Sequence, residues 1–297
     1  MDYRQLGKSD LNISRIGFGC MSLKPNQADA IDILHKAIDA GINYFDTADL
    51  YDKGLNEQLL GTAFKGRRDK VIIATKAGNQ WRADGSGWDW NPSKAYIVAC
   101  AEASLQRLQV DRIDLFQLHG GTINDPIDET IEAFEILKKQ GKIRYYGISS
   151  IRPNVIREYV KRSNIVSVMM QYSLLDRRPE EEALNLLLEN SIGVLARGSV
   201  ASGLLVDKPA KQYLDRTVEQ VAAAQELVHT YAGKRTPAQA AIQYVLHHPA
   251  VTSAVVGIRT MEQLNDVVGS STTQQLTIEE ITKLRTAIAP NVYAEHR

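Results

Sequence analysis

Short runs of β-branched and aromatic residues alternate with amphipathic helical segments along most of this chain. Such alternation is typical of βα units, which build a parallel sheet. Eight runs are expected to be strands: Ile16–Cys20, Ile42–Asp46, Val71–Lys76, Ile113–His119, Ile143–Ser149, Val166–Gln171, Gly193–Arg197 and Thr252–Gly257. Eight units in 297 residues fit a (β/α)8 TIM barrel, whereas a doubly wound sheet usually has about five or six strands. The pattern predicts one α/β barrel domain over residues 1–297.

The segments between the expected strands repeat apolar residues with the period of a helix. Two of them show one stripe each: Ile97, Ala101, Leu105 and Leu108 in the first, and Ile127, Ile131, Phe134 and Leu137 in the second. Gly141 follows the second stripe and is expected to end that helix, because glycine readily adopts the left-handed conformation after a last turn. Each helix should therefore lay one face on the sheet.

Two regions, one at the amino terminus and one after the seventh strand, lie outside the repeat. Tyr3–Leu6 and Leu11–Ile16, separated by Gly-Lys-Ser-Asp, are expected to form a β-hairpin that plugs the amino-terminal end of the barrel. After the seventh strand, Val200–Arg216 is irregular and precedes a helix near Thr217–Tyr231. This connection is thus longer than a simple barrel requires and could fold over a ligand, and we expect extra helices in the carboxy-terminal part of the chain.

A third region outside the repeat is the segment Ala77–Asn91, which is polar and contains glycine. It carries all three tryptophans of the protein, Trp81, Trp88 and Trp90. Long loops that follow barrel strands often cover a ligand. We expect this segment to be a lid, with Trp81 and Trp88 near the substrate; packing on the barrel rim is the alternative.

The charge balance argues against large anionic partners. Lys plus Arg and Asp plus Glu each number 35, so no net charge draws the chain to nucleic acid or to an anionic membrane. No apolar run approaches the ~20 residues that span a bilayer, and the amino terminus lacks an apolar signal core. We therefore expect a cytoplasmic protein, a monomer or weak homo-oligomer, with Cys20 and Cys100 reduced.

Polar residues stand at or beside the ends of six of the expected strands. They are Asp46, Lys76, His119, Ser149, Gln171 and Arg197. In a (β/α)8 barrel the carboxyl ends of the strands meet at one rim, and active sites lie there. These side chains are therefore expected to converge on one site.

The ordered motifs resemble those of the aldo-keto reductases. They are Phe-Asp-Thr-Ala-x-x-Tyr at 45–51, Thr-Lys at 75–76, Asp-Leu-x-x-x-His at 114–119, Gly-Ile-Ser at 147–149 and Gln-Tyr-Ser at 171–173. The resemblance runs from the first strand to about Asp266. Within the family, the chain is similar to the bacterial general or stress-type branch. The resemblance implies a (β/α)8 barrel that binds NADPH in extended form and reduces aldehydes or ketones. It assigns catalysis to Asp46, Tyr51, Lys76 and His119.

The residue types suit this chemistry. Hydride arriving at a carbonyl carbon leaves an alkoxide, so a positioned proton donor accelerates the reaction by about 10²- to 10⁴-fold. Tyr51 is the expected donor, and a cation at Lys76 would lower the tyrosine pKa from its usual value of about 10. Asp46 would hold Lys76 charged, while a neutral His119 would orient the carbonyl oxygen and so contact the substrate.

The resemblance also implies a cofactor site. Its residues would be Met21, Asp46, Ser149, Gln171, Arg197, Gly198, Val200, Ser202, Gly257, Arg259, Gln263 and Asp266. Ser149 and Gln171 would hold the nicotinamide carboxamide, and Ser150 replaces a usual asparagine. Arg197 stands where many relatives have a tyrosine that stacks on the nicotinamide. A guanidinium can stack on a neutral ring but not favourably on a cationic one, so we hypothesise that Arg197 favours NADPH over NADP⁺; a merely solvated Arg197 is the alternative.

The adenosine end should lie near residues 256–266. Gly257 allows close backbone approach, and Arg259 can fork onto a 2′-phosphate, a bond worth about 1.5–3 kcal/mol. That energy corresponds to a preference of roughly 10- to 100-fold for NADPH over NADH. Val256 and Val267 replace the proline and the adenine-binding asparagine of relatives, so the adenine contacts are expected to differ.

Two other functions compete with carbonyl reduction. A Schiff-base aldolase would use Lys76 as nucleophile, and a redox-sensing module would bind NADP(H) with slow turnover, as reductase-like channel subunits do. A Rossmann site at Gly17 and Gly19 is disfavoured because the third glycine of that fingerprint is missing. No metal is expected, since His119 has no partner at ligand spacing.

Overall fold

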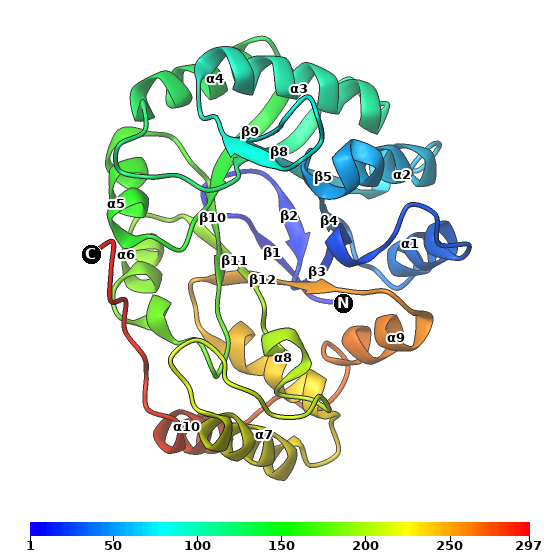
Figure 1. Cartoon of the computed structure of the whole chain (residues 1–297). Helices are drawn as coiled ribbons and strands as arrows, with labels where there is room; N and C mark the ends of the chain where they lie inside the picture. Colours follow the sequence, from blue (N-terminus) through cyan, green and yellow to red (C-terminus); the bar gives the residue numbers. More distant parts are fainter.

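The eight β-branched runs form parallel strands that close into a barrel in the computed structural model, which describes residues 1–297 (Figure 1). The strands are β3 (Ile16–Gly19), β4 (Tyr44–Asp46), β5 (Ile72–Ala77), β8 (Ile113–Leu118), β9 (Ile143–Ser149), β10 (Ser167–Gln171), β11 (Gly193–Arg197) and β12 (Val251–Gly257). Their order around the barrel follows the chain, with β12 pairing in parallel with β3 to close it. The predicted (β/α)8 fold is confirmed, and the strand ends lie within two residues of those expected.

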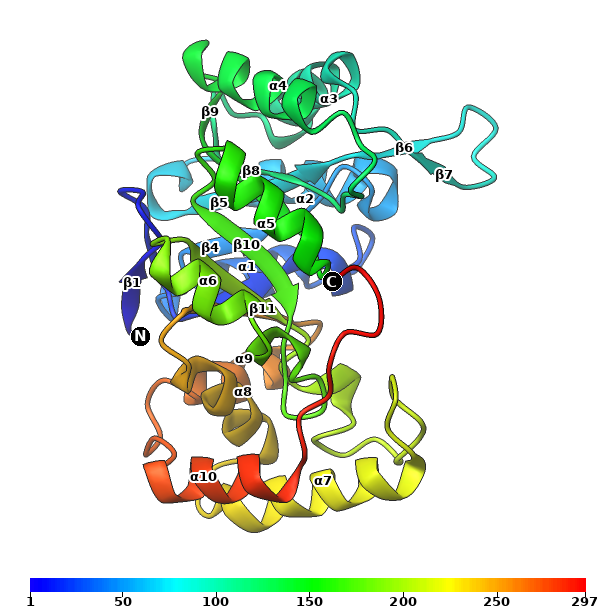
Figure 2. The ribbon, with the colours of Figure 1, turned by 90° about the vertical axis from the view of Figure 1, so that its left-hand side faces the viewer.

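Helices surround the barrel on the outside (Figure 1). They are α1 (Ala30–Asp39), α2 (Leu55–Ala63), α3 (Lys94–Leu108), α4 (Ile127–Lys139), α5 (Pro153–Arg162), α6 (Ala183–Glu189), α7 (Val218–Ala232), α8 (Pro237–His247), α9 (Met261–Gly269) and α10 (Ile278–Ala287). Eight of them complete βα units, and α7 and α10 are the extra helices. These two pack against each other beside the barrel (Figure 2).

The extra helices begin where the sequence offers strong caps. Thr217 and Thr277 start α7 and α10, and each side chain accepts a hydrogen bond from the backbone three residues on, in a reciprocal capping box. Such caps stabilise a helix by about 1 kcal/mol each. The helix predicted at 217–231 is α7, one residue displaced.

The predicted helical stripes face the barrel. Ile97, Ala101 and Leu108 are buried on α3, and Leu105 packs partly buried against the same core. On α4, Ile127, Phe134 and Leu137 are buried, and Ile131 packs partly buried against the core. Gly141 follows the last turn of α4 with φ +75°. The glycine therefore ends α4 in the left-handed conformation that the sequence indicated.

The amino-terminal hairpin seals the barrel. Strands β1 (Tyr3–Gln5) and β2 (Asn12–Ser14) pair antiparallel. Leu6, Leu11 and Ile13 are fully buried among apolar residues from the barrel interior. Gly7 lies in the turn with φ +54°. A β-carbon there would come within 2.3 Å of the carbonyl oxygen of Val166, the residue before β10. Only glycine fits so close to the barrel wall. The buried apolar side chains and this close approach confirm the predicted plug.

The segment after β5 differs from the long loop that we expected. It forms a second antiparallel hairpin, β6 (Asn79–Trp81) and β7 (Trp88–Trp90), that projects from the barrel (Figure 2). Trp81 pairs with Trp88 across the strands, while the Trp90 indole donates a hydrogen bond to Asp125 at 2.9 Å. Cross-strand aromatic pairs stabilise such ribbons, and single-sequence periodicity missed them because each strand has only three residues.

The segment 200–216 is irregular, as predicted, with one short turn at Ala201–Gly203 and a single bridge between Tyr213 and Arg216. Both cysteines are buried and free. None of the helices combines the length and the apolar character required to cross a bilayer.

Candidate active site

Four predicted side chains meet at the carboxyl end of the barrel. Asp46 ends β4, Lys76 is the last residue but one of β5, and His119 directly follows β8. Tyr51 begins the short turn after β4. Neighbouring parallel strands bring these residues together because their carboxyl ends share one rim.

Lys76 is the centre of the cluster. Its ammonium donates hydrogen bonds to Asp46 Oδ1 at 2.5 Å, to the carbonyl oxygen of Thr47 at 2.8 Å and to the Tyr51 hydroxyl at 3.3 Å. The residue is fully buried, so all three ammonium hydrogens are used within the protein. The hydroxyl of Tyr51 therefore lies against a buried cation.

The ionisation of this pair follows from burial and charge. Burial works to lower the pKa of Lys76, but Asp46 and Tyr51 outweigh it and raise that pKa above its usual value. Burial also raises the pKa of the Asp46 carboxyl, against the opposing charge of Lys76. The geometry favours the ion pair at neutral pH, since each charge is hydrogen-bonded to the other. A charged Lys76 has no free amine to act as a nucleophile.

The pKa of Tyr51 differs from the expectation. Burial of the phenol raises its pKa, and the charge of Lys76, aided by Arg197, offsets this only in part. Lys76 acts in the predicted direction, but desolvation of the phenolate is the larger effect. The hydroxyl consequently holds its proton at neutral pH.

His119 stands beside the phenol, ring edge to ring face. The two ring centroids lie 5.8 Å apart at an interplanar angle of 83°. Burial, together with the charges of Lys76 and Arg197, lowers the pKa of His119 to about 3. The imidazole is therefore neutral at physiological pH, as predicted, and its buried Nδ1 has no hydrogen-bond partner.

The residues predicted for the nicotinamide end are on the same rim. Ser149 ends β9 and its hydroxyl makes no hydrogen bond within the protein, whereas the Ser150 hydroxyl accepts one from the Arg152 backbone at 3.2 Å. Gln171 is fully engaged: its amide donates to Asp176 and to Tyr213, both at 3.0 Å, and accepts from Arg197 at 2.9 Å. Arg197 is exposed and has no carboxylate partner. The site therefore has one free hydroxyl and one uncompensated guanidinium.

The loop after β11 carries three more predicted cofactor residues, Gly198, Val200 and Ser202. Its backbone is strained, since φ is +74° at Gly198, +47° at Ala201 and +59° at Ser202. Positive φ at residues other than glycine is costly and concentrates in segments that clamp ligands. Val200 packs on the core, which leaves the exposed Ser202 side chain available.

The residues predicted for the adenosine end lie at β12 and α9. Gly257 ends β12, and a β-carbon there would come within 2.7 Å of the Ser22 hydroxyl. The Arg259 side chain is exposed and unpaired, just before the amino terminus of α9. The Gln263 side chain accepts a hydrogen bond from the Arg259 backbone at 2.9 Å, and Thr260 caps α9 by accepting one from the Gln263 backbone at 3.2 Å.

Two residues of this region have structural partners. Asp266 Oδ1 accepts hydrogen bonds from Thr236 at 2.7 Å and from Gln239 at 3.0 Å, which ties α9 to α8. Val267 is 5% exposed and belongs to the hydrophobic core. Val267 stands where the resemblance implies an asparagine, and here the side chain packs in the core.

The remaining predicted residues lie around the rim. The Met21 side chain is 59% exposed in the turn after β3. The Trp81 indole donates to the carbonyl oxygen of Leu50 at 3.3 Å, which brings the hairpin next to the Tyr51 turn. Trp88 is 48% exposed on the hairpin. Trp81 is therefore placed near the cluster, whereas its cross-strand partner Trp88 is mainly exposed to solvent.

Two residues of the cluster were not predicted. Gln117 donates to Asp46 Oδ2 at 3.2 Å and is fully buried. The carbonyl oxygen of Thr47 accepts a hydrogen bond from Lys76, and its hydroxyl donates one to Asn56 Oδ1 at 2.7 Å. Strand alternation could have found Gln117, because it stands two residues before His119 and so faces the same side.

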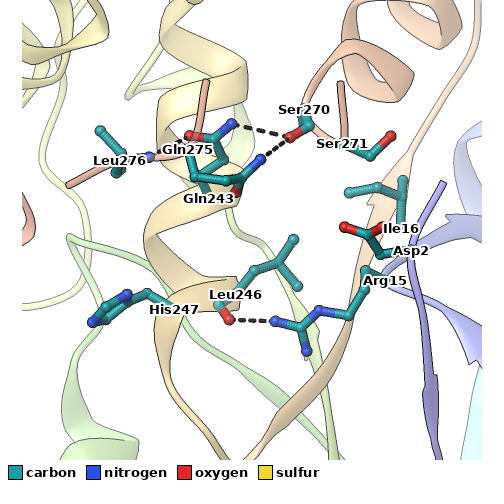
Figure 3. Close-up of a pocket in the computed structure, with 10 residues that line it drawn as sticks. All are labelled: Asp2, Arg15, Ile16, Gln243, Leu246, His247, Ser270, Ser271, Gln275 and Leu276. Atoms are coloured by element: carbon teal, nitrogen blue, oxygen red, sulfur yellow. Dashed lines mark hydrogen bonds between the residues drawn. The ribbon is translucent and has the colours of Figure 1, made fainter. Parts of the chain in front are cut away.

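A separate pocket of about 320 Å³ lies at the opposite end of the barrel (Figure 3). Arg15, just before β3, donates there to the carbonyl oxygens of Leu246 and Val251, and burial lowers its pKa to about 10. Gln243 donates to the carbonyl oxygen of Ser270 at 3.0 Å. These bonds tie helix ends to the strand starts, and none of the predicted site residues lines this pocket.

The chain is similar to known proteins over nearly its whole length. The model of the aldo/keto reductase family matches residues 15–289. The "uncharacterized oxidoreductase YqkF" of Bacillus subtilis is 52% identical over 306 residues, with both chains covered in full. The holo form of the aldo-keto reductase AKR11C1 from Bacillus halodurans has 51% identity and a TM-score of 0.96, covering 100% of this chain and 99% of that one.

Two further solved structures are similar. The apo form of AKR11C1 has a TM-score of 0.88 at 48% identity, covering 100% of this chain and 99% of that one. The glycerol dehydrogenase AKR11B4 from Gluconobacter oxydans has a TM-score of 0.86 at 26% identity, covering 98% and 97%. This chain is thus more similar in backbone to the holo form than to the apo form of the Bacillus halodurans protein.

Proposed function

This chain belongs to the aldo/keto reductase family, and from that premise we propose that it reduces aldehydes or ketones to alcohols with NADPH, with Tyr51 as the proton donor. Family membership supports oxidoreduction of carbonyl compounds in general. The proposal adds the proton donor, the cofactor and the roles of the individual side chains.

The observation that carries the proposal is the buried ammonium of Lys76, held between Asp46 and the Tyr51 hydroxyl. A phenol that gives up its proton becomes an anion, and a cation 3.3 Å away stabilises that anion. The stabilisation is greater in a buried site than in water because the local dielectric is low. Tyr51 can therefore keep its proton at rest and still release it in the transition state.

The cofactor, when bound, supplies a hydride for the carbonyl carbon. As the new C–H bond forms and the C=O π bond breaks, the Tyr51 proton passes to the carbonyl oxygen and forms the O–H bond of the alcohol. The Lys76 ammonium then balances the phenolate, and Asp46 keeps Lys76 protonated. The neutral His119 ring donates a hydrogen bond to the same oxygen and fixes its orientation.

The residues of this chain fit a phosphorylated dinucleotide. Arg259 offers an unpaired guanidinium beside the first turn of α9, where backbone N–H groups also favour an anion. Ser149 ends β9 and the strained loop at 198–203 follows β11, so we expect both to contact the dinucleotide between that anion site and the catalytic cluster. The greater similarity to a holo structure supports a site that is already formed.

An aldolase acting through Lys76 is disfavoured. Schiff-base formation requires a neutral amine, and enzymes obtain it by lowering the lysine pKa. Here the contact with Asp46 raises that pKa. Trapping with borohydride in the presence of a carbonyl substrate should leave Lys76 unmodified.

The test is a panel of aldehydes and ketones, assayed by the loss of NADPH absorbance and repeated with NADH. Reduction of at least one class, with NADPH preferred by roughly 10- to 100-fold, is expected from one charge-assisted phosphate contact. No turnover with any carbonyl would refute the reductase function. Tight NADPH binding with only slow turnover would favour the redox-sensing alternative.

A further inference from the structure

A buried carboxylate that the proposed chemistry does not use lies next to the proton donor. Asp49 stands two residues before Tyr51 and is 8% exposed. Its Oδ2 accepts a hydrogen bond from the Cys100 thiol at 3.0 Å and from the Tyr96 hydroxyl at 3.1 Å, while its buried Oδ1 has no partner. Neither partner is a cation, and Asp49 forms no salt bridge.

This arrangement is unfavourable for an ionised group. Burial raises the pKa of Asp49 to about 6, and the nearby Glu57 carboxylate adds to the effect, while hydrogen bonds from Cys100 and Tyr96 oppose it. Glu57 itself is paired with Arg107 at 2.6 Å. Folding therefore works against the ionised form of Asp49 at neutral pH, and perturbed buried carboxyls of this kind concentrate at functional sites.

The hydrogen bonds of Asp49 connect the two sides of the active site. Its backbone N–H donates to the carbonyl oxygen of Lys76 at 3.2 Å. Its partner Tyr96 shares its single hydroxyl hydrogen between Asp49, 3.1 Å away, and the carbonyl oxygen of Asn79, 3.3 Å away. The Asn79 side chain in turn donates to the carbonyl oxygen of His119 at 3.1 Å. One network thus runs from the turn that carries the proton donor to the backbone of the orienting histidine.

The turn that this network anchors is strained. Directly after Tyr51, Asp52 and Lys53 have φ of 48° and 56°, and Gly54 has φ of 85°. A β-carbon on Gly54 would come within 2.7 Å of the Arg107 side chain on α3. A strained turn persists only when its surroundings hold it, and α3 supplies both the Arg107 and the Asp49 contacts.

We propose that Asp49 is a positioning residue, which acts through Tyr96 and Asn79 to hold Tyr51 and His119 in their productive relation. The ionised carboxylate only accepts hydrogen bonds, so it directs the hydroxyl of Tyr96 and the thiol of Cys100 towards itself. Protonation of the free Oδ1 removes the negative charge that strengthens both hydrogen bonds at Oδ2, and so loosens the anchor. The inference rests on the proposed roles of Tyr51 and His119.

The experiment compares Asp49→Ala, Asp49→Asn and Tyr96→Phe with the unaltered protein. Asp49→Ala and Tyr96→Phe should lower kcat by about 10- to 100-fold with little change in KM, because misplacement of a catalytic group by about 1 Å has effects of this order. In the unaltered protein kcat should rise as pH increases through about 6. Asp49→Asn keeps an acceptor but carries no charge, so its kcat should fall towards that of the protonated form and should no longer change through about pH 6.

Tyr159→Phe is the matched control. Tyr159 lies on α5, and its buried hydroxyl has no hydrogen-bond partner. This variant also removes a buried tyrosine hydroxyl and should leave kcat unchanged. If Asp49→Ala fails to fold, Tyr96→Phe still tests the network. An unchanged kcat in Tyr96→Phe, or an acidic limb that survives in Asp49→Asn, would overturn the proposal.

A second measurement does not depend on activity. Hydrogen exchange of peptides covering 46–54 and 77–81 should speed up in Asp49→Ala and Tyr96→Phe but not in Tyr159→Phe. Faster exchange in a protein that reduces no carbonyl would keep the anchoring role and refute the reductase function instead. Unchanged exchange with unchanged kinetics would refute the anchor.

Discussion

Replacement of Tyr51 by phenylalanine separates proton donation from every other role of this side chain. The phenylalanine ring keeps the edge-to-face contact with His119, whose centroid lies 5.8 Å away. Only the hydroxyl is lost, and with it one long hydrogen bond from Lys76 at 3.3 Å. Lys76 retains its bonds to Asp46 and to the carbonyl oxygen of Thr47.

The expected effect is large on the rate and small on the fold. General acid catalysis contributes about 10²- to 10⁴-fold, so removal of the donor should raise the activation free energy by about 2.7–5.4 kcal/mol at 1.36 kcal/mol for each factor of ten. The lost hydrogen bond is longer than usual, so the free energy of unfolding should fall by no more than about 1 kcal/mol.

The assay is single-turnover reduction of the best aldehyde from the substrate panel, followed by NADPH absorbance. Titration by nucleotide fluorescence should show the same NADPH affinity within about twofold, because the hydroxyl is not part of the phosphate or adenosine contacts. In the unaltered protein, activity should persist to alkaline pH and decline only as the phenol ionises, since burial raises the pKa of Tyr51.

A loss of activity smaller than about tenfold in Tyr51→Phe would refute the role of Tyr51 as the proton donor. A parallel loss of NADPH affinity would show instead that the hydroxyl organises the cofactor site. Tyr159→Phe serves again as the control for loss of a buried hydroxyl, and its rate should match that of the unaltered protein.

Four further outcomes are expected. Arg259→Ala should weaken NADPH binding by roughly 10- to 100-fold and leave NADH binding unchanged, as loss of one charge-assisted phosphate contact requires; equal weakening of both would exclude the phosphate contact. Arg197→Tyr should lower the ratio of NADPH to NADP⁺ affinity, because a guanidinium disfavours the cationic ring; an unchanged ratio, measured by titration of both forms, would contradict stacking. Alanine at Trp81 should raise KM for aromatic aldehydes more than for small ones, and alanine at the exposed Trp88 should do so less; identical shifts for all substrates would show that the hairpin does not contact them. Leu11→Ala should reduce the free energy of unfolding by about 2–5 kcal/mol, since the side chain is 1% exposed in the plug; a reduction below about 1 kcal/mol in chemical denaturation would contradict the sealing role.

The sequence by itself determined the barrel and the place of the candidate catalytic cluster. The alternation of strand and helix periods specifies which residues face the sheet, and it does so locally, within each unit. Because the carboxyl ends of parallel strands share one rim, Asp46, Lys76 and His119 could be brought together from their positions at strand ends. The motif around Tyr51 then placed the phenol beside them.

Only the tertiary structure decided the ionisation and the anchoring of that cluster. The sequence indicated that Lys76 would lower the Tyr51 pKa, but the net shift is upward because burial outweighs the charge. The contact between Asp49 and Cys100 joins residues 51 positions apart, on elements whose packing no local pattern specifies. Burial and long-range contacts depend on how all the elements pack together, and so the sequence supplied the reacting groups while the fold set their proton affinities and held them in place.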